Sequence, residues 1–419
     1  MSILNQATNG RLRLCLMIAS LFTLQTVRSQ RAKPVLPAAY RTGVYFPLLQ
    51  GKRIGLFANN TAMIGNTHLV DTLIHSGIRV TKIFGPEHGF RGDADAGEKV
   101  GNYTDTKTGI PVISLYGKKN KPSPEDLADV DIMLFDLQDV GVRFYTYISS
   151  LQEYIEAALE NGKPILILDR PNPNGFYVDG PVLDTAFRSF VGMQPVPVVY
   201  GMTLGEYAFM IAGEKWLSAK ANARYEYDKH AQNGADTPFH FQVIKCANYT
   251  HSSKYVLPVK PSPNLPDMSC VYLYPSTCFF EGTVMSEGRG TDHPFAIFGH
   301  PSLPKTLFAF TPRSTPGAKN PKLENKLCYG WNLFKPDQQV LKDVNSTLQI
   351  KWLLEAYRLF PDKDNFFTKG FNRLAGNNEL MQQVKDGRTE SEIRASWEPR
   401  LQAFKKIRKK YLLYPDFKE

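Results

Sequence analysis

Carboxylate, amide and arginine side chains follow four apolar runs in the first half of the chain. The first run ends in Asn59-Asn60-Thr61, and later runs end in the segments Gly85–Gly92 (GPEHGFRG), Asp136–Tyr147 (DLQDVGVRFYTY) and Asp169–Pro173 (DRPNP). Polar residues after a single strand mean little, because loops need caps and turns. Four such segments converging on one edge of a parallel sheet indicate a ligand site.

The residue types in these segments favour acid–base chemistry on a sugar. Two carboxylates at neighbouring strand ends can supply the acid and base that glycosidic cleavage requires. The guanidinium groups of Arg91, Arg143 and Arg170 can bind a substrate carboxylate or phosphate in a bidentate manner. The rings of Tyr145 and Tyr147 can stack on a sugar while their hydroxyls hydrogen-bond to it.

Several of these candidates also have a structural explanation. Asp169 and Arg170 can form a buried ion pair that fixes the sheet edge, and Asp136 can cap the turn after its strand. Glu87 suits a core or a helix least, because proline and glycine residues surround it. Conformationally unusual loops at strand ends carry function, so Glu87 is the leading catalytic candidate, whereas His88 alone is ambiguous.

Signatures of several other enzyme classes are missing from the sequence. There is no G-x-S-x-G motif to mark a serine nucleophile. The first strand–helix turn lacks G-x-G-x-x-G, and no P-loop is found, which argues against a nucleotide cofactor. No histidines pair at i and i+4 and no C-x-x-C is present, so we expect neither a metal nor a cofactor.

The elements that position these segments alternate between apolar runs and helical patterns from residue 50 to about 230. The predicted strands are Arg53–Ala58, Arg79–Phe84, Pro111–Leu115, Asp131–Phe135, Pro164–Leu168 and Val196–Val199. Near-continuous apolar runs are typical of strands buried on both faces. Helices are predicted at Tyr147–Glu160 and Thr203–Ala212, the second opened by a Thr203–Glu206 capping pattern. The alternation predicts an α/β fold with a Rossmann-like, doubly wound parallel sheet.

Prolines interrupt the chain after residue 230, and a Gly-rich segment and two helical patterns follow. The helical patterns cover Leu348–Phe360 and Glu390–Leu412. We interpret residues 40–235 as a Rossmann-like catalytic domain. Residues 240–419 then form a second, smaller α+β domain that closes the cleft.

The first 29 residues are typical of a secretory signal peptide. Arg11 and Arg13 precede the apolar run Leu14–Leu24, and Val27–Ser29 offers small residues around a cleavage point. The run is too short to span a bilayer, and no later segment approaches the ~20 apolar residues that a span needs. We therefore expect an exported bacterial protein, periplasmic or secreted, with no transmembrane segment after signal cleavage.

The composition fits a globular protein, with 42% hydrophobic and 21% charged residues. The net charge of +10 arises in the N-terminal segment and in one cluster formed by Lys405, Lys406, Arg408, Lys409 and Lys410. In the rest of the chain, basic and acidic residues are nearly equal in number, and no nucleic-acid-binding motif is found. We therefore expect no nucleic-acid partner. Cleavage would leave Cys246, Cys270, Cys278 and Cys328, whose spacing fits no zinc pattern and leaves disulfide pairing open.

Taken together, the motifs resemble the NamZ family, long described only as a domain of unknown function. The resemblance runs in the same order from about residue 40 to the C-terminus and includes three of the strand-end segments together with Ser262–Pro266 (SPNLP), Glu281–Thr283 (EGT) and Glu287–Phe295 (EGRGTDHPF). It implies an exo-β-N-acetylmuramidase that releases N-acetylmuramic acid from the non-reducing ends of peptidoglycan fragments. It also implies a Rossmann-like domain joined to a smaller one, with the active site in the cleft between them and muropeptides or disaccharides as substrates.

The same resemblance implies roles for individual residues. Glu87 corresponds to a catalytic carboxylate, and the DLQD segment, with Asp136, Gln138 and Asp139, lines the same cleft. Three residues of the second domain close over the substrate, namely Glu287, Arg289 and Thr291. Asn60 stands where we expect a glutamine that contacts the sugar.

Muramic acid differs from other amino sugars by a lactyl ether that carries a carboxylate. We assign its recognition to Arg143 first and Arg170 second. Glu87 is our general acid, with Asp139 as base or nucleophile. A carboxyl separation of ~5 Å would mean retention and ~6.5–9.5 Å inversion, and the sequence leaves this open. The remaining candidates for substrate binding are His88, Arg91, Tyr145, Tyr147, Asp169 and Asn172. The competing hypothesis is a non-catalytic cell-wall sugar-binding protein.

Overall fold

A computed structural model of the chain describes residues 33–87, 89–91, 101–231 and 241–418. Residues from Val35 to the C-terminus form one compact unit. The predicted signal peptide and His88 lie outside the described residues, so both remain predictions.

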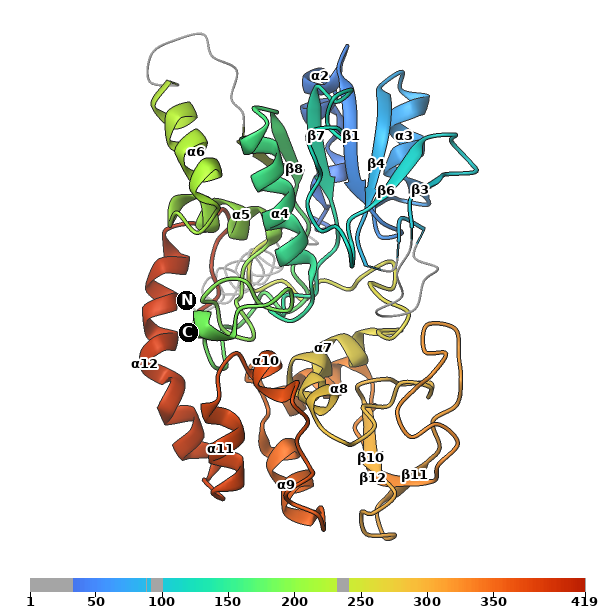
Figure 1. The fold of residues 1–419 in the computed structure, drawn as a ribbon, viewed down its shortest axis with the longest axis vertical. Helices are drawn as coiled ribbons and strands as arrows, with labels where there is room; N and C mark the ends of the chain where they lie inside the picture. The colour runs from blue at the N-terminus through green and yellow to red at the C-terminus, as the bar shows by residue number, and fades with distance from the viewer. Residues whose placement is uncertain (1–32, 88, 92–100, 232–240, 419) are drawn as a thin grey trace, which may run out of the picture. The chain divides into compact units, whose positions relative to one another are not determined.

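A seven-stranded sheet forms the centre of the first half of the chain (Figure 1). Its strands lie in the order β5-β6-β4-β1-β7-β8-β9. Their bounds are β1 (Arg53–Ala58), β4 (Arg79–Gly85), β5 (Tyr103–Thr104), β6 (Pro111–Ser114), β7 (Ile132–Asp136), β8 (Ile165–Leu168) and β9 (Phe241–Ile244). All neighbours are parallel except the short edge strand β5, which runs antiparallel to β6. The predicted parallel α/β sheet is therefore confirmed.

One predicted strand is wrong and one real strand was missed. Val196–Val199 is not a strand, because Val199 forms only isolated bridges to Val142 and Asp179. The edge of the sheet is instead β9, which pairs with β8 along its whole length. The Val196–Val199 run is apolar because it is a buried loop, whereas only the ends of β9 are buried. The sheet thus continues past residue 235, where we expected the first domain to end.

Alternate residues of the central strands face two separate cores. Phe57 of β1 packs on the side of α4 (Tyr147–Glu160), and its neighbour Leu56 packs on the side of α2 (Thr42–Leu49) and α3 (Leu69–His75). Period-2 alternation in a strand with both faces covered explains why both neighbours are fully buried. Helices thus cover both faces of the sheet, as a doubly wound fold requires.

The predicted helices of the first half form within a residue or two of their expected bounds. The capping box at Thr203 and Glu206 is present, and each side chain bonds to the backbone of the other residue. The other short elements here are η1 (Ala38–Tyr40), the β2–β3 hairpin (Met63–Ile64, Thr67–His68), η2 (Thr185–Phe187), α5 (Leu204–Gly213) and α6 (Ala219–Ala231).

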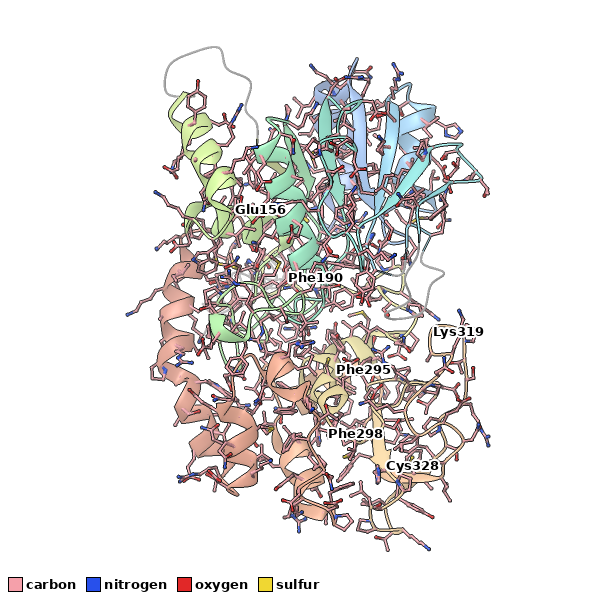
Figure 2. All side chains as sticks on the ribbon, in the orientation of Figure 1. Glu156, Phe190, Phe295, Phe298, Lys319 and Cys328 are labelled. Carbon is pink, nitrogen blue, oxygen red and sulfur yellow. The ribbon has the colours of Figure 1, made fainter. Side chains whose placement is uncertain are left out.

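The second half contains a small antiparallel sheet and several helices. Its three strands lie in the order β10-β12-β11. Phe298 of β10 (labelled in Figure 2) stacks with Phe280 and with Trp331 of β12, at ring-centroid distances of 4.2 and 5.1 Å. The bounds are α7 (Met268–Thr277), η3 (Cys278–Gly282), β10 (Ile297–His300), β11 (Phe308–Phe310), β12 (Cys328–Asn332), α8 (Asp337–Val344), α9 (Lys351–Leu359), α10 (Phe371–Ala375), α11 (Glu379–Lys385) and α12 (Glu390–Lys409). This is the smaller α+β domain that we expected.

The C-terminal residues return to the first half of the fold. Arg408 near the end of α12 donates to the carbonyl oxygen of Gly201 and pairs with Asp416. The hydroxyl of Tyr414 donates to Asp169 (2.6 Å) after β8 and accepts from the backbone N–H of Cys246. The last residues of the chain therefore complete the carboxyl edge of the first domain.

Four cysteines occur in the described part of the chain, and all are buried free thiols: Cys246, Cys270, Cys278 and Cys328. The pairing that the sequence left open is therefore absent among them. Within the same residues, no helix has the length and apolarity to cross a membrane.

Candidate active site

A cavity of about 290 Å³ lies where the carboxyl edge of the sheet meets the loops of the second half. Its lining from the first half is Glu87, Tyr116, Phe144, Tyr145, Thr146, Tyr147 and Val191. Its lining from the second half is Ser262, Asn264, Leu265, Tyr274, Glu281, Arg289 and Phe295. Glu87 follows β4, Tyr116 follows β6 and Thr146 precedes α4. The cavity therefore occupies the edge at which parallel sheets bind ligands.

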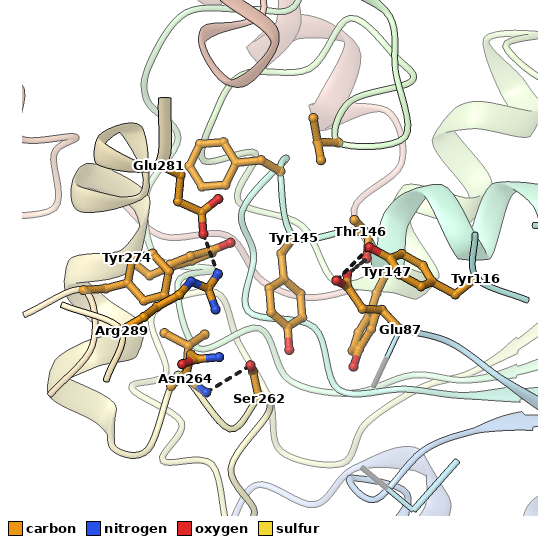
Figure 3. A pocket seen from close by; sticks show the side chains of 14 residues that line it. Glu87, Tyr116, Tyr145, Thr146, Tyr147, Ser262, Asn264, Tyr274, Glu281 and Arg289 are labelled. Carbon is orange, nitrogen blue, oxygen red and sulfur yellow. Dashed lines mark hydrogen bonds and ion pairs between the residues drawn. The ribbon is translucent and has the colours of Figure 1, made fainter. Parts of the chain in front are cut away.

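Glu87 projects into this cavity with both carboxylate oxygens engaged. The hydroxyl of Tyr116 donates to Oε1 (2.9 Å), and that of Thr146 donates to Oε2 (3.1 Å) (Figure 3). Thr146 is the N-cap residue of α4 but makes no side-chain capping bond, so its hydroxyl serves Glu87 instead. The two hydroxyls come from different strand–helix connections, and together they fix the plane of the carboxyl group.

The opposite wall carries a second carboxylate and an arginine. Glu281 and Arg289 form an ion pair there, across Tyr145 from Glu87 (Figure 3). Arg289 Nε also pairs with Glu287 (3.2 Å). Burial opposes the charge on Arg289, but the two neighbouring carboxylates outweigh it and raise the pKa of its guanidinium group above the usual value. Arg289 is therefore a fixed cation in the cavity wall.

A partly exposed lysine holds this wall in place. Lys322 Nζ donates to the carbonyl oxygens of Phe280 and Glu281 (both 3.0 Å) and of Thr283 (3.2 Å), and it forms an ion pair with Glu287 (3.0 Å). The ammonium group of Lys322 thus donates hydrogen bonds to several carbonyl oxygens of the turn that carries Glu281. Such bonds to a charged donor contribute about 1.5–3 kcal/mol each, so the turn is held firmly.

Aromatic rings form the floor between the two walls. Tyr145 and Tyr147 pack edge to face, with centroids 4.8 Å apart, and both line the cavity as predicted. Their hydroxyls are already bonded: that of Tyr145 donates to Pro261 O (2.7 Å), and that of Tyr147 accepts from Asn59 Nδ2 (2.6 Å). Burial raises the pKa of both phenols, so they stay neutral. The rings can therefore offer packing surface rather than free hydroxyls.

The Ser262–Pro266 segment forms a tight turn at the base of the cavity. Ser262 Oγ accepts from the backbone N–H of Asn264 (3.2 Å), and Asn264 Nδ2 donates to Gly317 O (2.8 Å). Both side chains lie on the same side as Arg289 (Figure 3). This turn supplies polar groups that can bind sugar hydroxyls.

The prediction that Arg143 binds the substrate carboxylate is wrong. Its side chain is fully buried, and its guanidinium group donates to four backbone carbonyls, those of Pro181, Val196, Leu374 and Ala375 (2.8–2.9 Å). Burial without a carboxylate partner lowers the pKa of Arg143 to about 9. Gly376, at φ +77°, allows the close approach, because a Cβ there would lie 2.7 Å from Nη2. Arg143 ties the two halves of the fold together.

Arg170, the second choice, is also structural. It forms a buried bidentate pair with Asp136, with Nη2 2.8 Å from Oδ2. The buried ion pair that we considered for Asp169 and Arg170 is thus formed between Arg170 and Asp136. Asp136 is therefore neither a turn cap nor a substrate ligand. Asp169 accepts from Thr203, Tyr414 and the backbone N–H of Gly205. The side chains of Asp136, Asp169 and Arg170 do not line the cavity.

Asp139 is not placed to act as the partner of Glu87. It is almost fully buried and does not line the cavity, and its Oδ2 accepts from Tyr200 Oη and from the backbone N–H of Gly141. Burial raises the pKa of Asp139 to about 7, although these two bonds oppose the rise. The carboxylate that shares the cavity with Glu87 is Glu281.

The other predicted binding residues fall into two groups. Four bond to other parts of the protein and do not line the cavity: Gln138 to Pro171 O, Asn172 to Met202 O, Arg91 to Asp105, and Thr291 to Gly288 O. Asn60 is partly exposed and bonds to Lys260 O (3.3 Å). Glu287 is buried behind Arg289. Of the predicted site residues that the structure describes, only Glu87, Tyr145, Tyr147 and Arg289 line the cavity.

Sequence reasoning missed several residues of the site. Tyr116 and Thr146 lie beside strand ends that were predicted, but a single hydroxyl there carries no distinctive pattern. Ser262, Asn264 and Glu281 belong to the short motifs SPNLP and EGT, which were recognised as motifs but given no role. Motif membership was therefore the signal that could have found them.

Comparisons with known proteins show the family of the chain. The N-terminal domain model of the exo-beta-N-acetylmuramidase NamZ matches residues 54–269, and the C-terminal domain model matches residues 272–414. The chain belongs to the NamZ family. The family models meet within α7, beyond the limits of 235 and 240 that we expected for the two domains.

Individual members of the NamZ family resemble the chain over most of its length. The peptidoglycan beta-N-acetylmuramidase NamZ of Bacillus subtilis (strain 168) is 40% identical over 388 residues, which cover 88% of this chain and 89% of that protein. A crystal structure of a DUF1343 family protein from Bacteroides fragilis matches with a TM-score of 0.80 and 44% identity over 92% of this chain and all of the other. A second DUF1343 structure from that organism matches with a TM-score of 0.73 and 27% sequence identity, over 91% of this chain and 99% of the other.

Proposed function

We propose that the chain is an exo-acting glycoside hydrolase that removes N-acetylmuramic acid from the non-reducing end of peptidoglycan fragments. Its family membership supports the reaction class. The observation that carries the assignment of the site is Glu87, oriented by two hydroxyls in a cavity that also contains Glu281 and Arg289.

The size of the cavity suits exo action. About 290 Å³ is at the lower end of small-molecule sites, which span roughly 300–1,000 Å³. This volume suits one sugar residue rather than a threaded glycan. We therefore expect the terminal muramic acid to fill the cavity and the rest of the fragment to project toward solvent. Muropeptides and disaccharides are the substrate forms that we propose.

Two carboxylates face the cavity, as glycosidic cleavage requires. We assign Glu87 as the general acid that protonates the leaving oxygen, with Tyr116 and Thr146 holding the carboxyl group in line. Glu281 replaces Asp139 as the second carboxylate, acting on the sugar as nucleophile or through water as base. Its ion pair with Arg289 fixes the position of its carboxylate in the cavity wall.

The lactyl carboxylate requires a cation in the cavity, and Arg289 is the only one among the fourteen lining residues. Arg289 is fixed by Glu281 and Glu287, so its guanidinium group is oriented before the substrate arrives. We propose that Arg289, in place of Arg143, recognises the group that distinguishes muramic acid from glucosamine.

Release of 4-nitrophenol from 4-nitrophenyl N-acetylmuramide tests the reaction, with the N-acetylglucosaminide as control. We expect release from the muramide only. Glu87→Gln should lower kcat by about 10²–10⁴-fold, the usual contribution of a general acid, without changing the thermal unfolding transition. Absence of release by the wild-type chain, with N-acetylmuramic acid still bound, would leave a sugar-binding protein instead.

The stereochemical outcome tests the role of Glu281. Proton NMR of the first-formed anomer during hydrolysis distinguishes retention from inversion. Glu281→Gln should abolish turnover by either route, and Asp139→Asn is the matched control because Asp139 lies outside the cavity. Equal activity of Glu281→Gln and wild type would refute the assignment.

We also propose that the chain acts outside the cytoplasm, in the periplasm or as a secreted enzyme. The signal-like segment at residues 1–29 and a peptidoglycan substrate both support export. N-terminal sequencing of the protein recovered from cell fractions tests this proposal. A full-length protein confined to the cytosolic fraction would contradict it.

A further inference from the structure

A cysteine, a histidine and an aspartate meet on the outer side of the wall that carries Tyr274 and Phe295. Asp267, Cys270 and His293 each offer one donor atom, and these atoms all lie within 4.8 Å of one another. Among the described residues this is the only group of three or more such side chains with that spacing. The three residues are separated by 3, 23 and 26 positions, a spacing that matches no zinc motif, so sequence reasoning could not find them.

We propose that these three side chains bind a zinc ion that fastens the start of α7 to the loop before β10. A thiolate, an imidazole and a carboxylate form a donor set that zinc accepts, with a water molecule as fourth ligand. Magnesium and calcium prefer oxygen donors alone, so the sulfur selects against them.

The aspartate–histidine geometry already matches a tetrahedral site. Bonds of 2.0–2.2 Å from zinc to nitrogen and oxygen place two ligand atoms roughly 3.4 Å apart. His293 Nδ1 lies 3.4 Å from Asp267 Oδ2, which is too long for a good hydrogen bond. The sulfur of Cys270 lies within 4.8 Å of both of these atoms.

Surrounding bonds orient each ligand for this role. Asp267 caps α7 through Oδ1, which accepts from the backbone N–H of Cys270 (2.9 Å) and leaves Oδ2 toward His293. The ring of His293 stacks on Phe334 with centroids 3.5 Å apart. Supporting interactions of this kind are what hold ligands ready in metal sites.

Charge and access also fit a divalent cation. Asp337 at the start of α8 is close enough that the negative charge of Asp267, after burial, raises the pKa of its carboxyl group. The carboxylates of Asp267 and Asp337 therefore create a negative potential at the proposed zinc site. Cys270 is fully buried, whereas the side chains of Asp267 and His293 are 33% and 28% exposed, so an ion can enter from solvent. The thiol proton leaves as the metal binds.

The proposed zinc site lies next to residues that form the wall of the cavity, so a bound ion can stabilise that wall. Leu265 and Tyr274, which flank the ligands of α7, and Phe295, two residues after His293, all line the cavity. Phe295 adopts the left-handed conformation (φ +66°) and packs edge to face on Tyr274, with centroids 4.8 Å apart. A metal ion that joins these segments would offset the backbone strain at Phe295 and hold the wall rigid.

Titration of the chelator-treated protein with Co²⁺ tests the proposal without any measurement of activity. Cobalt bound to a thiolate gives an intense charge-transfer absorption, which reports sulfur ligation directly. We expect one Co²⁺ per chain, displacement by an equivalent of Zn²⁺, and a rise in unfolding temperature with bound zinc. Failure of the wild-type protein to bind either ion at micromolar concentration would overturn the proposal.

Substitutions then locate the site. Cys270→Ala should remove the charge-transfer absorption, and His293→Ala, which changes a partly exposed side chain, should weaken zinc binding at least tenfold. Cys328→Ala and His300→Ala are matched controls that should bind as wild type. Retention of the absorption in Cys270→Ala, or its loss in Cys328→Ala, would show that the ion binds elsewhere and would contradict the proposal.

Discussion

Two sets of charged side chains lie within one fold and behave in opposite ways. At the sheet edge, Asp136 and Arg170 pair in full burial, and Arg143 is enclosed by backbone carbonyls. In the cavity, Glu281 and Arg289 pair at a surface that a ligand can reach. The residue types are the same, so type alone does not distinguish structural charges from functional ones. What distinguishes them is whether a ligand in the cavity can reach the charged groups.

The largest expected effect concerns the buried pair. Arg170→Met leaves the carboxylate of Asp136 buried and unpaired, which should lower the free energy of unfolding by about 3–5 kcal/mol. Arg289→Met, at the accessible pair, should change it far less. Chemical denaturation of both variants measures the contrast. The double variant Asp136→Leu with Arg170→Met should recover stability, and failure to recover would mean that more than the ion pair is lost.

The pH dependence of stability offers a second contrast. The pKa of Asp139 is raised from its ordinary value of 3.8 to about 7 by burial. The folded protein therefore keeps a proton that the unfolded chain releases, and stability falls as pH rises from about 4 to about 7. The full difference is on the order of 4 kcal/mol.

Asp139→Asn should remove this part of the pH slope, whatever its effect at a single pH. Denaturation curves at several pH values between 4 and 8 measure it, with the exposed Asp364→Asn as control. An unchanged slope in Asp139→Asn would mean that Asp139 is ionised in the folded state throughout this range.

A smaller effect is expected for ligand selectivity at the accessible pair. In the Glu87→Gln background, Arg289→Met should weaken binding of N-acetylmuramic acid by about 10–100-fold, since a hydrogen bond to a charged group contributes about 1.5–3 kcal/mol. Calorimetric titration measures this affinity. The methyl ester of the ligand should bind equally to both proteins, and an equal loss for acid and ester would show that Arg289 acts on the fold rather than on the lactyl carboxylate.

The smallest effects are expected from the hydroxyls that orient Glu87. Tyr116→Phe and Thr146→Val each remove one hydrogen bond to its carboxylate. Each should lower kcat/KM by about 2–10-fold, in line with 0.5–1.5 kcal/mol per bond. Ser114→Ala serves as a control because Ser114, the last residue of β6, does not line the cavity. A larger loss in either variant would give that hydroxyl a direct role toward the substrate.

The sequence predicted the central elements well and the edges poorly. β1 and α4 have the expected bounds, because a near-continuous apolar run and apolar residues at helical spacing are both strong signals in a sequence. β9 was missed because an edge strand alternates burial over only four residues. Val196–Val199 has the composition of a strand, but its burial comes from a loop packed in the core.

The site was predicted in outline and not in detail. Glu87 was named correctly as a lining residue because it stands in an unusual, glycine-rich segment, and Arg289 was named through the resemblance to the NamZ family. Arg143 and Asp139 were misplaced because a local pattern shows which residues follow a strand, but not which way a side chain turns. The partners that bury Arg143, Leu374 and Ala375, lie more than 200 residues further along the chain.

The return of the C-terminal residues to the sheet edge has a consequence for the order of folding. The carboxyl group of Asp169 gains its bond from Tyr414 only when the last turn of the chain is in place, and Leu36 near the start pairs with Ala247. Contacts so distant in sequence form slowly, because a long loop must close first. During synthesis, the first domain therefore emerges from the ribosome long before its final partner. Its carboxyl edge is complete only after Tyr414 has been synthesised, so we expect the two domains to finish folding together although one is made first.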